Sequence, residues 1–153
     1  MKTEIAKGTS NATSSSKGIT AVAHEIILDK DLPNGPFKTY CVLAMLAQQD
    51  GETYSGIPLD NVIISNTSLS DGAFRLYCIM GTFYIGDPVP LFYDTETIAF
   101  RMRCSISSAR RYIKELTDAG IIEKVRYKYT KDFYETGFIV HDCIRDTAEA
   151  YHV

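Results

Sequence analysis

One segment in the C-terminal half constrains the fold more than any other. In SISSARRYIKELTDAG (105–120), a serine precedes an apolar run with helical spacing, and a glycine follows it. The apolar positions recur at intervals of three and four and form one predicted buried stripe, made of Ile106, Ala109, Ile113 and Leu116. We therefore predict a helix from Ser105 to Ala119, with Ser105 as its cap and Gly120 as its stop.

The next segment has the pattern of a β-hairpin. IIEKVRYKY (Ile121–Tyr129) alternates apolar and basic residues, which is typical of a strand whose two faces differ. TKD then predicts a turn, and FYETGFIV (Phe133–Val140) predicts the second strand. One face of this hairpin should be basic and the other should pack. Tyr127, Tyr129 and Tyr134 either pack across the strands, which is the simpler account, or stack on bases.

The residues before position 105 predict a loop and a short helix. Two prolines exclude a helix from Ile85–Asp94, so we expect a loop that leads into a short extended segment at Leu91–Tyr93. Thr95–Met102 predicts a short helix capped by Asp94 or Thr95. A tight turn then joins this helix to the longer one.

The first half of the chain contains an internal echo. LPNGPFKTYCVLAML (Leu32–Leu46) aligns with LSDGAFRLYCIMGTF (Leu69–Phe83) at an offset of 37 residues. Both copies predict helices, capped by Asn34 and Asp71. The aromatic positions have helical spacing and are expected in the core, namely Phe37, Tyr40, Phe74 and Tyr77. Because the copies diverge after the helix, we interpret the echo as a partial duplication.

Composition then divides the chain. We predict a disordered tail at 1–20, a strand-and-helix extension at 21–60, a main domain at 61–142 and a C-terminal tail at 143–153. Within the extension, AVAHEIIL (Ala21–Leu28) predicts a short strand or an ordered arm, and the polar residues 48–61 predict a loop.

The segment DTETIAFRMRCSISSARRYIKELTDAGIIEKVRYKY (94–129) resembles the winged helix-turn-helix superfamily. It looks like the pattern in phage and plasmid replication initiators and in many bacterial regulators. The resemblance runs from Leu69 to about Val140 and implies a mainly α fold with a small β-hairpin (α+β), here with an extra N-terminal helix. The superfamily also includes modules that bind only proteins. Arg103 stands at a turn position that is often glycine, so a positive φ there would strain it.

The distribution of charge indicates a polyanionic partner. The chain has a net charge of −3, yet residues 101–131 contain nine basic and three acidic residues. The remainder contains seven basic and sixteen acidic residues. The candidate DNA-binding residues are Arg101, Arg103, Ser105, Ser107, Ser108, Arg110, Arg111, Lys114, Lys124, Arg126, Lys128 and Lys131.

Other classes of protein find no support in the sequence. It has no glycine-rich phosphate loop, metal-ligand spacing or nucleophile elbow, so we predict no enzyme, no metal site and no cofactor. The cysteines are far apart and predict small buried residues of a reducing compartment, at positions Cys41, Cys78, Cys104 and Cys143. With no apolar run of about 20 residues and no signal-peptide core, the chain is expected to be cytoplasmic and not membrane-bound.

Two functions fit these patterns. The first is sequence-specific binding of double-stranded DNA, for replication initiation or transcription regulation in a mobile element, with the 105–119 helix in the major groove and the 121–140 wing on the backbone. The second is a protein-docking or inhibitor module of a phage or plasmid that binds a host or phage protein. A replication or regulatory protein is a further candidate partner. The N-terminal helix is expected either to pack against the module or to form a homodimer.

Overall fold

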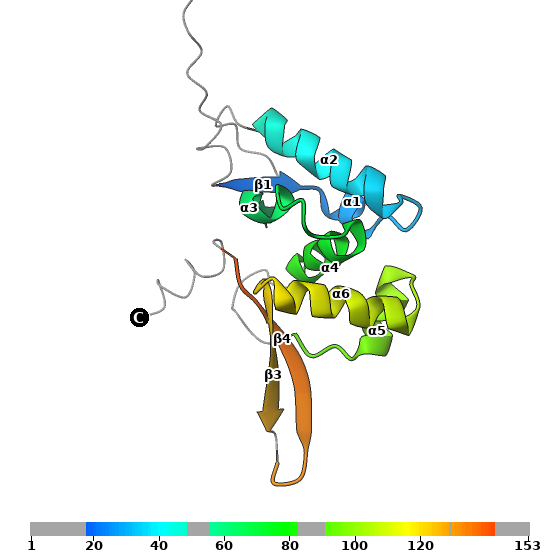
Figure 1. Ribbon diagram of the computed structural model, residues 1–153, viewed down its shortest axis with the longest axis vertical. Helices are drawn as coiled ribbons and strands as arrows, with labels where there is room; N and C mark the ends of the chain where they lie inside the picture. The colour runs from blue at the N-terminus through cyan, green and yellow to red at the C-terminus, as the bar shows by residue number, and fades with distance from the viewer. Residues whose placement is uncertain (1–17, 49–55, 83–90, 129, 143–153) are drawn as a thin grey trace, which may run out of the picture.

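The computed structural model describes residues 18–48, 56–82, 91–128 and 130–142. In these residues, six helices and two antiparallel two-stranded sheets follow one another (Figure 1). The elements are β1 (Ile19–Val22), α1 (His24–Leu28), α2 (Asn34–Ala47), β2 (Ile57–Asp60), α3 (Asn61–Ile64), α4 (Asp71–Gly81), α5 (Thr95–Met102), α6 (Ile106–Asp118), β3 (Ile122–Lys128) and β4 (Tyr134–Val140). None of the helices in these ranges is long and apolar enough to cross a bilayer.

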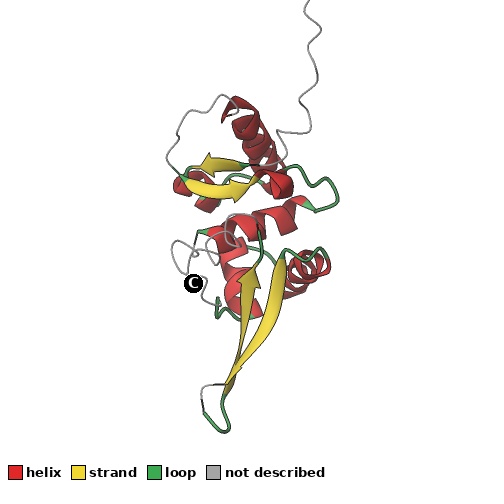
Figure 2. Ribbon diagram, turned by 90° about the vertical axis from the view of Figure 1, so that its left-hand side faces the viewer, coloured by secondary structure: helices red, strands yellow, loops and turns green. Residues whose placement is uncertain are grey.

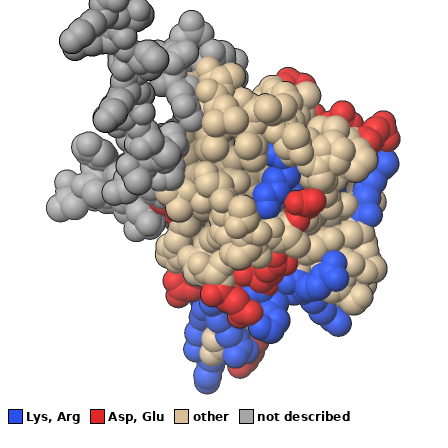
Figure 3. Space-filling view, turned by 45° about the horizontal axis from the view of Figure 1, so that its top comes forward, with Lys and Arg blue, Asp and Glu red and all other residues tan. Residues whose placement is uncertain are grey.

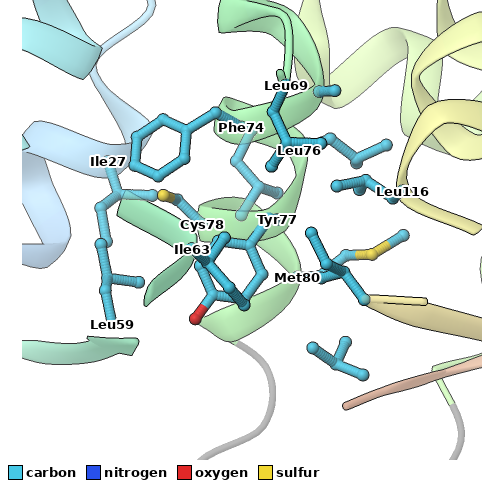
Figure 4. Close-up of a cluster of buried hydrophobic side chains, with 14 of the residues drawn as sticks. Ile27, Leu59, Ile63, Leu69, Phe74, Leu76, Tyr77, Cys78, Met80 and Leu116 are labelled. Carbon is cyan, nitrogen blue, oxygen red and sulfur yellow. The ribbon is translucent and has the colours of Figure 1, made fainter. Parts of the chain in front are cut away.

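The elements are stacked along the long axis of the molecule, with α4 near the centre. At one end lie α2 and the β1–β2 sheet, and at the other the β3–β4 hairpin projects from beneath α6 (Figures 1 and 2). The middle helix contacts α2 on one side and α6 on the other. Its Phe74, Leu76, Tyr77 and Cys78 are all buried and form the centre of the core (Figure 4).

The helices and the hairpin predicted for the C-terminal half are confirmed, whereas residues 85–90 of the predicted loop lie outside the described residues. The α5 helix has the predicted bounds, and Asp94 Oδ1 caps it by accepting from Thr97 N at 2.7 Å. Hydrogen bonds from the side chain and the backbone of Thr97 lower the pKa of Asp94. The cap of α6 is Ser105, and Gly120 follows the helix with φ +70°. The predicted extended segment is seen at Leu91, which forms a bridge with Phe138 of β4 through two backbone hydrogen bonds of 2.8 and 2.9 Å.

The N-terminal predictions require correction. The β1 strand begins at Ile19, inside the predicted tail, and Thr20 is fully buried with its hydroxyl donating to Asn61 Oδ1 at 2.5 Å. The predicted loop at 48–61 contains β2, which pairs with β1. Strand structure ends at Val22, and α1 occupies the rest of the Ala21–Leu28 segment. The remainder of the predicted tail and the whole of the C-terminal tail lie outside the described residues.

The predicted caps of the two similar helices are also wrong by one residue. The cap of α2 is Pro33, with no side-chain hydrogen bond, and that of α4 is Ser70, whose hydroxyl accepts from Ala73 N at 3.2 Å. Asn34 and Asp71 are instead the first helical residues. The helices therefore start one position earlier than expected, because Pro33 and Ser70 already have the extended backbone of a cap.

The internal duplication is more complete than the sequence predicts. Each copy contains a strand, a short helix and a long helix, and the two strands pair with each other. Lys38 Nζ donates to the carbonyls of Asn66 and Leu69 at 3.3 and 2.9 Å. Arg75, its equivalent in the second copy, donates to the carbonyls 37 residues earlier, those of Asp29 and Leu32. Each cation thus holds the loop of the other copy, which gives the pair of copies an approximate twofold relation.

The same two cations also contact a phenylalanine ring of the other copy. Lys38 Nζ lies 5.6 Å from the ring of Phe74, and the Arg75 guanidinium lies 4.8 Å from the ring of Phe37. The two phenylalanine rings are 5.9 Å apart. Tyr40 differs from the prediction, since it is 40% exposed whereas its equivalent Tyr77 is fully buried.

Candidate nucleic-acid interface

The α6 helix is held between α4, α5 and the hairpin. Ala109 and Leu116 are fully buried, as the apolar spacing predicts, and Ile113 is partly buried. The predicted stripe is wrong at Ile106, which is 41% exposed. Ile106 lies in the first turn, whereas the contacts with α4 are made further along the helix.

Two side chains of α6 fix how it lies on α4. A Cβ at Gly72 would overlap the ring of Tyr112, so glycine allows the two helices to approach closely. The Glu115 carboxylate accepts from the backbone N–H and the hydroxyl of Ser70, the latter at 2.8 Å. Glu115 therefore accepts hydrogen bonds at the N-terminus of α4, where the helix dipole makes a negative charge favourable. Sequence reasoning did not identify this contact.

The opposite face of α6 is exposed and basic. Ser107, Arg110 and Arg111 are all exposed, and the Arg111 guanidinium lies 5.2 Å from the ring of its neighbour Tyr112. Lys114 shares this face, but its ammonium lies 2.5 Å from the carboxylate of Asp118, which partly balances its charge.

The three acidic residues between positions 101 and 131 each contact a residue other than Arg110 or Arg111. Glu115 bonds to Ser70, Asp118 to Lys114, and the Glu123 carboxylate lies 3.0 Å from the ring of His141. Among the described residues, no carboxylate lies within ion-pair distance of Arg110 or Arg111. The positive charge of these arginines is therefore not compensated by the parts of the protein that the structure describes.

The turn before α6 places further basic residues beside this face. Arg103 has φ 49° and ψ 44°, the left-handed conformation expected if the turn position is one that often holds glycine. The guanidinium of Arg101 lies 5.0 Å from the ring of Tyr93, and both arginines are exposed. The hydroxyl of Ser105 is used in the cap, since it accepts from Ser108 N at 3.1 Å and lies 3.0 Å from the Ser108 hydroxyl.

Substitution of Arg103 by glycine is expected to stabilise the fold and to weaken DNA binding. We expect Arg103→Gly to raise the free energy of unfolding by about 1 kcal/mol, because glycine adopts a positive φ without strain. The same change should weaken duplex binding about threefold through the lost charge. Arg103→Ala is the matched control, since it removes the charge but keeps the strain. Urea denaturation and fluorescence anisotropy measure the two effects, and an unchanged stability in Arg103→Gly would contradict the strain.

The three cysteines that the structure describes are thiols and not disulfide-bonded. Cys41 and Cys78 are buried, as predicted, whereas Cys104 beside the turn is only partly buried. Burial raises the pKa of the Cys104 thiol, and the charge of Arg111 partly offsets this. Cys143 lies outside the described residues.

The hairpin has one basic face, as its alternation predicts. Lys124, Arg126 and Lys128 are exposed on the same face of β3, and Lys128 pairs with Tyr134 across the hairpin. The Arg126 guanidinium and the Lys128 ammonium lie 4.3 and 5.4 Å from the Tyr134 ring. Lys131 is exposed in the turn. Tyr134 therefore makes cation–π contacts with two of the basic side chains on this face.

The other face of the hairpin packs against the chain. The rings of Tyr127 and Phe92 meet edge to face, with centroids 5.6 Å apart. Gly137 leaves room for this packing, since a Cβ there would lie 3.0 Å from the Phe92 ring. Tyr127 thus has an aromatic packing partner within the protein. Tyr129 lies outside the described residues.

The comparison with known protein families agrees with this geometry. Residues 67–122 match the family described as a helix-turn-helix domain. This part of the chain is a helix-turn-helix domain. No curated protein and no solved structure matches the chain.

The helix-turn-helix domain comprises α4, α5 and α6, and its presence indicates DNA as the partner. Its exposed cations and those of the hairpin form two neighbouring groups, because the hairpin projects beyond α6 (Figure 1). On the face drawn in Figure 3, most Lys and Arg atoms lie in the lower part, next to Asp and Glu atoms, and smaller groups of both signs lie near the centre and at the upper right edge. No group of three metal-ligating side chains occurs among the residues that the structure describes.

Proposed function

We propose that this protein binds duplex DNA as a winged helix-turn-helix protein, with α6 in the major groove and the β3–β4 hairpin as its wing. The observation that carries the proposal is that Arg110 and Arg111 are exposed and that, in the part of the chain the structure describes, no carboxylate forms an ion pair with either of them. The hairpin follows α6 directly, and the Leu91 bridge adds a third strand position to it, which is the arrangement of a wing.

The exposed side chains divide into two roles. Near the N-terminus of α6, the small Ser107 permits close approach to the groove, and the arginines one turn later can donate in pairs to guanine. Lys124, Arg126 and Lys128 are suited to the phosphate backbone, because they share one exposed strand face. The α6 helix therefore reads bases, and the hairpin fixes orientation.

We also propose a biological setting. The likeness of residues 94–129 to phage and plasmid replication initiators supports a role in replication initiation or transcription regulation of a mobile element. Both roles require an intracellular location. Chromatin immunoprecipitation with sequencing in the source cell would distinguish a replication origin from promoters.

The two roles predict different mutant effects. Arg111→Ala should weaken binding to a selected site by about tenfold or more and binding to random duplex much less, because it removes contacts to bases. Lys128→Ala should weaken binding to the selected site and to random duplex by about the same factor, which should be smaller than the loss of Arg111→Ala at the selected site. Selection of sites from random DNA, followed by fluorescence anisotropy, gives these affinities. Equal losses on both duplexes for Arg111→Ala would remove its base-reading role.

A groove of about 1060 Å³ favours a second candidate function, the docking of a protein. It lies between the α1–α2 loop and α5, and it is lined by apolar residues including Phe100, which is 84% exposed. Lys30, Arg101 and Arg103 also line it, so the docked protein would be acidic. A gel shift separates the candidates: absence of any retardation of random duplex at low salt would favour docking over DNA binding.

A further inference from the structure

The outward face of α2 is a continuous stripe without charge, here called the α2 stripe. It consists of Pro36, Thr39, Tyr40, Leu43, Leu46 and Ala47. Leu43 and Leu46 are 61% and 54% exposed, although leucine is usually buried. The stripe extends over about 16 Å, at 1.5 Å per residue. The residues that α2 turns to the core, Phe37, Cys41 and Met45, lie on the opposite side of the helix.

The internal duplication shows how such a stripe is used. Four of the six stripe positions have a described equivalent 37 residues later on α4, and these four residues are all buried, namely Ala73, Leu76, Tyr77 and Met80. In Figure 4, Leu76 and Met80 lie on the side of α4 toward Leu116 of α6. The stripe on α4 is therefore in part a helix-packing surface for α6, whereas none of the helices that the structure describes covers the stripe on α2.

We propose that the α2 stripe binds the α2 stripe of a second copy of this chain. A twofold interface pairs a surface with itself, so it favours a surface without like charges, and the α2 stripe has none. The single charged residue of α2, Lys38, is turned inward to the carbonyls of Asn66 and Leu69. The stripe offers no charge to guide an oppositely charged partner, whereas an identical stripe matches it in length and polarity.

This dimer has a consequence for DNA. The α2 helix lies toward one end of the molecule, and α6 and the hairpin lie toward the other, with α4 between them (Figures 1 and 2). Two copies joined through α2 therefore hold their helix-turn-helix domains at opposite ends, facing away from each other. Given the proposed binding of DNA, on which this step rests, the dimer joins two separate duplex segments instead of occupying adjacent half-sites on one duplex.

Sedimentation equilibrium of the full chain tests the contact itself. The wild type is expected to dimerise with a dissociation constant in the micromolar range, since the interface is small. Leu43→Glu should weaken the dimer by roughly tenfold or more, because it buries a charge at the centre of the stripe. Val62→Glu on α3 is the matched control, as Val62 is 52% exposed outside the stripe, and it should leave the dimer unchanged. A monomeric wild type at about 100 μM, or equal dimerisation of Leu43→Glu, would overturn the proposal.

Capture of a labelled duplex on beads that carry a second duplex tests the bridging. Duplexes of about 30 base pairs and random sequence at low salt avoid the need for a known site. The wild type should bridge, whereas Leu43→Glu should retard one duplex in gels but lose at least about tenfold of the capture. Retardation without capture by the wild type would refute bridging and leave DNA binding intact. Absence of retardation would refute DNA binding, and sedimentation would still decide the α2 contact.

Discussion

Arg75→Met is expected to lower the free energy of unfolding by about 3–5 kcal/mol, which is large for a change outside the apolar core. The guanidinium of Arg75 donates to the carbonyls of Ile27, Asp29 and Leu32, and the residue is only 7% exposed. Methionine fills much of the space but leaves these carbonyls without their donor. Burial already lowers the pKa of Arg75, with Asp29 opposing this shift, so the charge is retained at a cost in solvation.

Lys38→Met is the matched control, because the duplication places Lys38 at the same position of the other copy. Lys38 donates to two carbonyls, and its side chain is 16% exposed, so we expect a smaller loss of about 1–2 kcal/mol. Arg75→Lys should fall between the two, since one ammonium cannot replace a planar fork. Urea denaturation followed by far-UV circular dichroism measures all three. A loss below about 1 kcal/mol in Arg75→Met would contradict the proposed role of the carbonyl contacts.

The double change Arg110→Glu with Arg111→Glu is expected to weaken duplex binding by roughly 100-fold or more, because it reverses two charges at the centre of the interface. Both side chains are exposed, so the melting temperature should change little. Lys114→Glu on the same helix should have a smaller effect, since Asp118 already balances that charge. Lys30→Glu, in the loop between α1 and α2, is the charge-matched control for Lys114→Glu, since each change reverses one charge. Fluorescence anisotropy with one duplex gives the four affinities, and similar losses in all variants would indicate a nonspecific charge effect.

The C-terminal half could be predicted from the sequence because its signals are local. The cap, the apolar spacing and the glycine stop of α6 lie within sixteen residues, from Ser105 to Gly120, and the alternation of the hairpin lies within one strand. The basic faces follow from the same periodicities. The left-handed Arg103 was also foreseeable, because the resemblance identified its position in the turn.

The N-terminal sheet could not be predicted in the same way. β1 and β2 have four residues each and pair over about forty positions of sequence, so neither has a pattern that specifies its partner. The contacts that Lys38 and Arg75 make with the other copy could not be predicted from the sequence for a different reason. Their acceptors are backbone carbonyls, which any residue supplies. The Glu115–Ser70 contact likewise joins residues 45 positions apart, and Glu115 resembles an ordinary surface residue of an amphipathic helix.

The exposure of the α2 stripe also required the structure. Tyr40 and Tyr77 occupy equivalent positions in the duplication, and the sequence gives no reason to treat them differently. Only the second copy is followed by α5 and α6, and α6 covers the stripe of α4. The difference between the copies therefore arises from what packs on them and not from the helices themselves.

The dependence of duplex affinity on salt shows directly whether the exposed cations of α6 and the hairpin contact phosphates. If about five phosphates are neutralised, the logarithm of the association constant should fall with the logarithm of the salt concentration at a slope of about −4.5. The Arg110→Glu, Arg111→Glu variant should show a clearly shallower slope. An affinity that does not change with salt, or no binding even at low salt, would contradict the account.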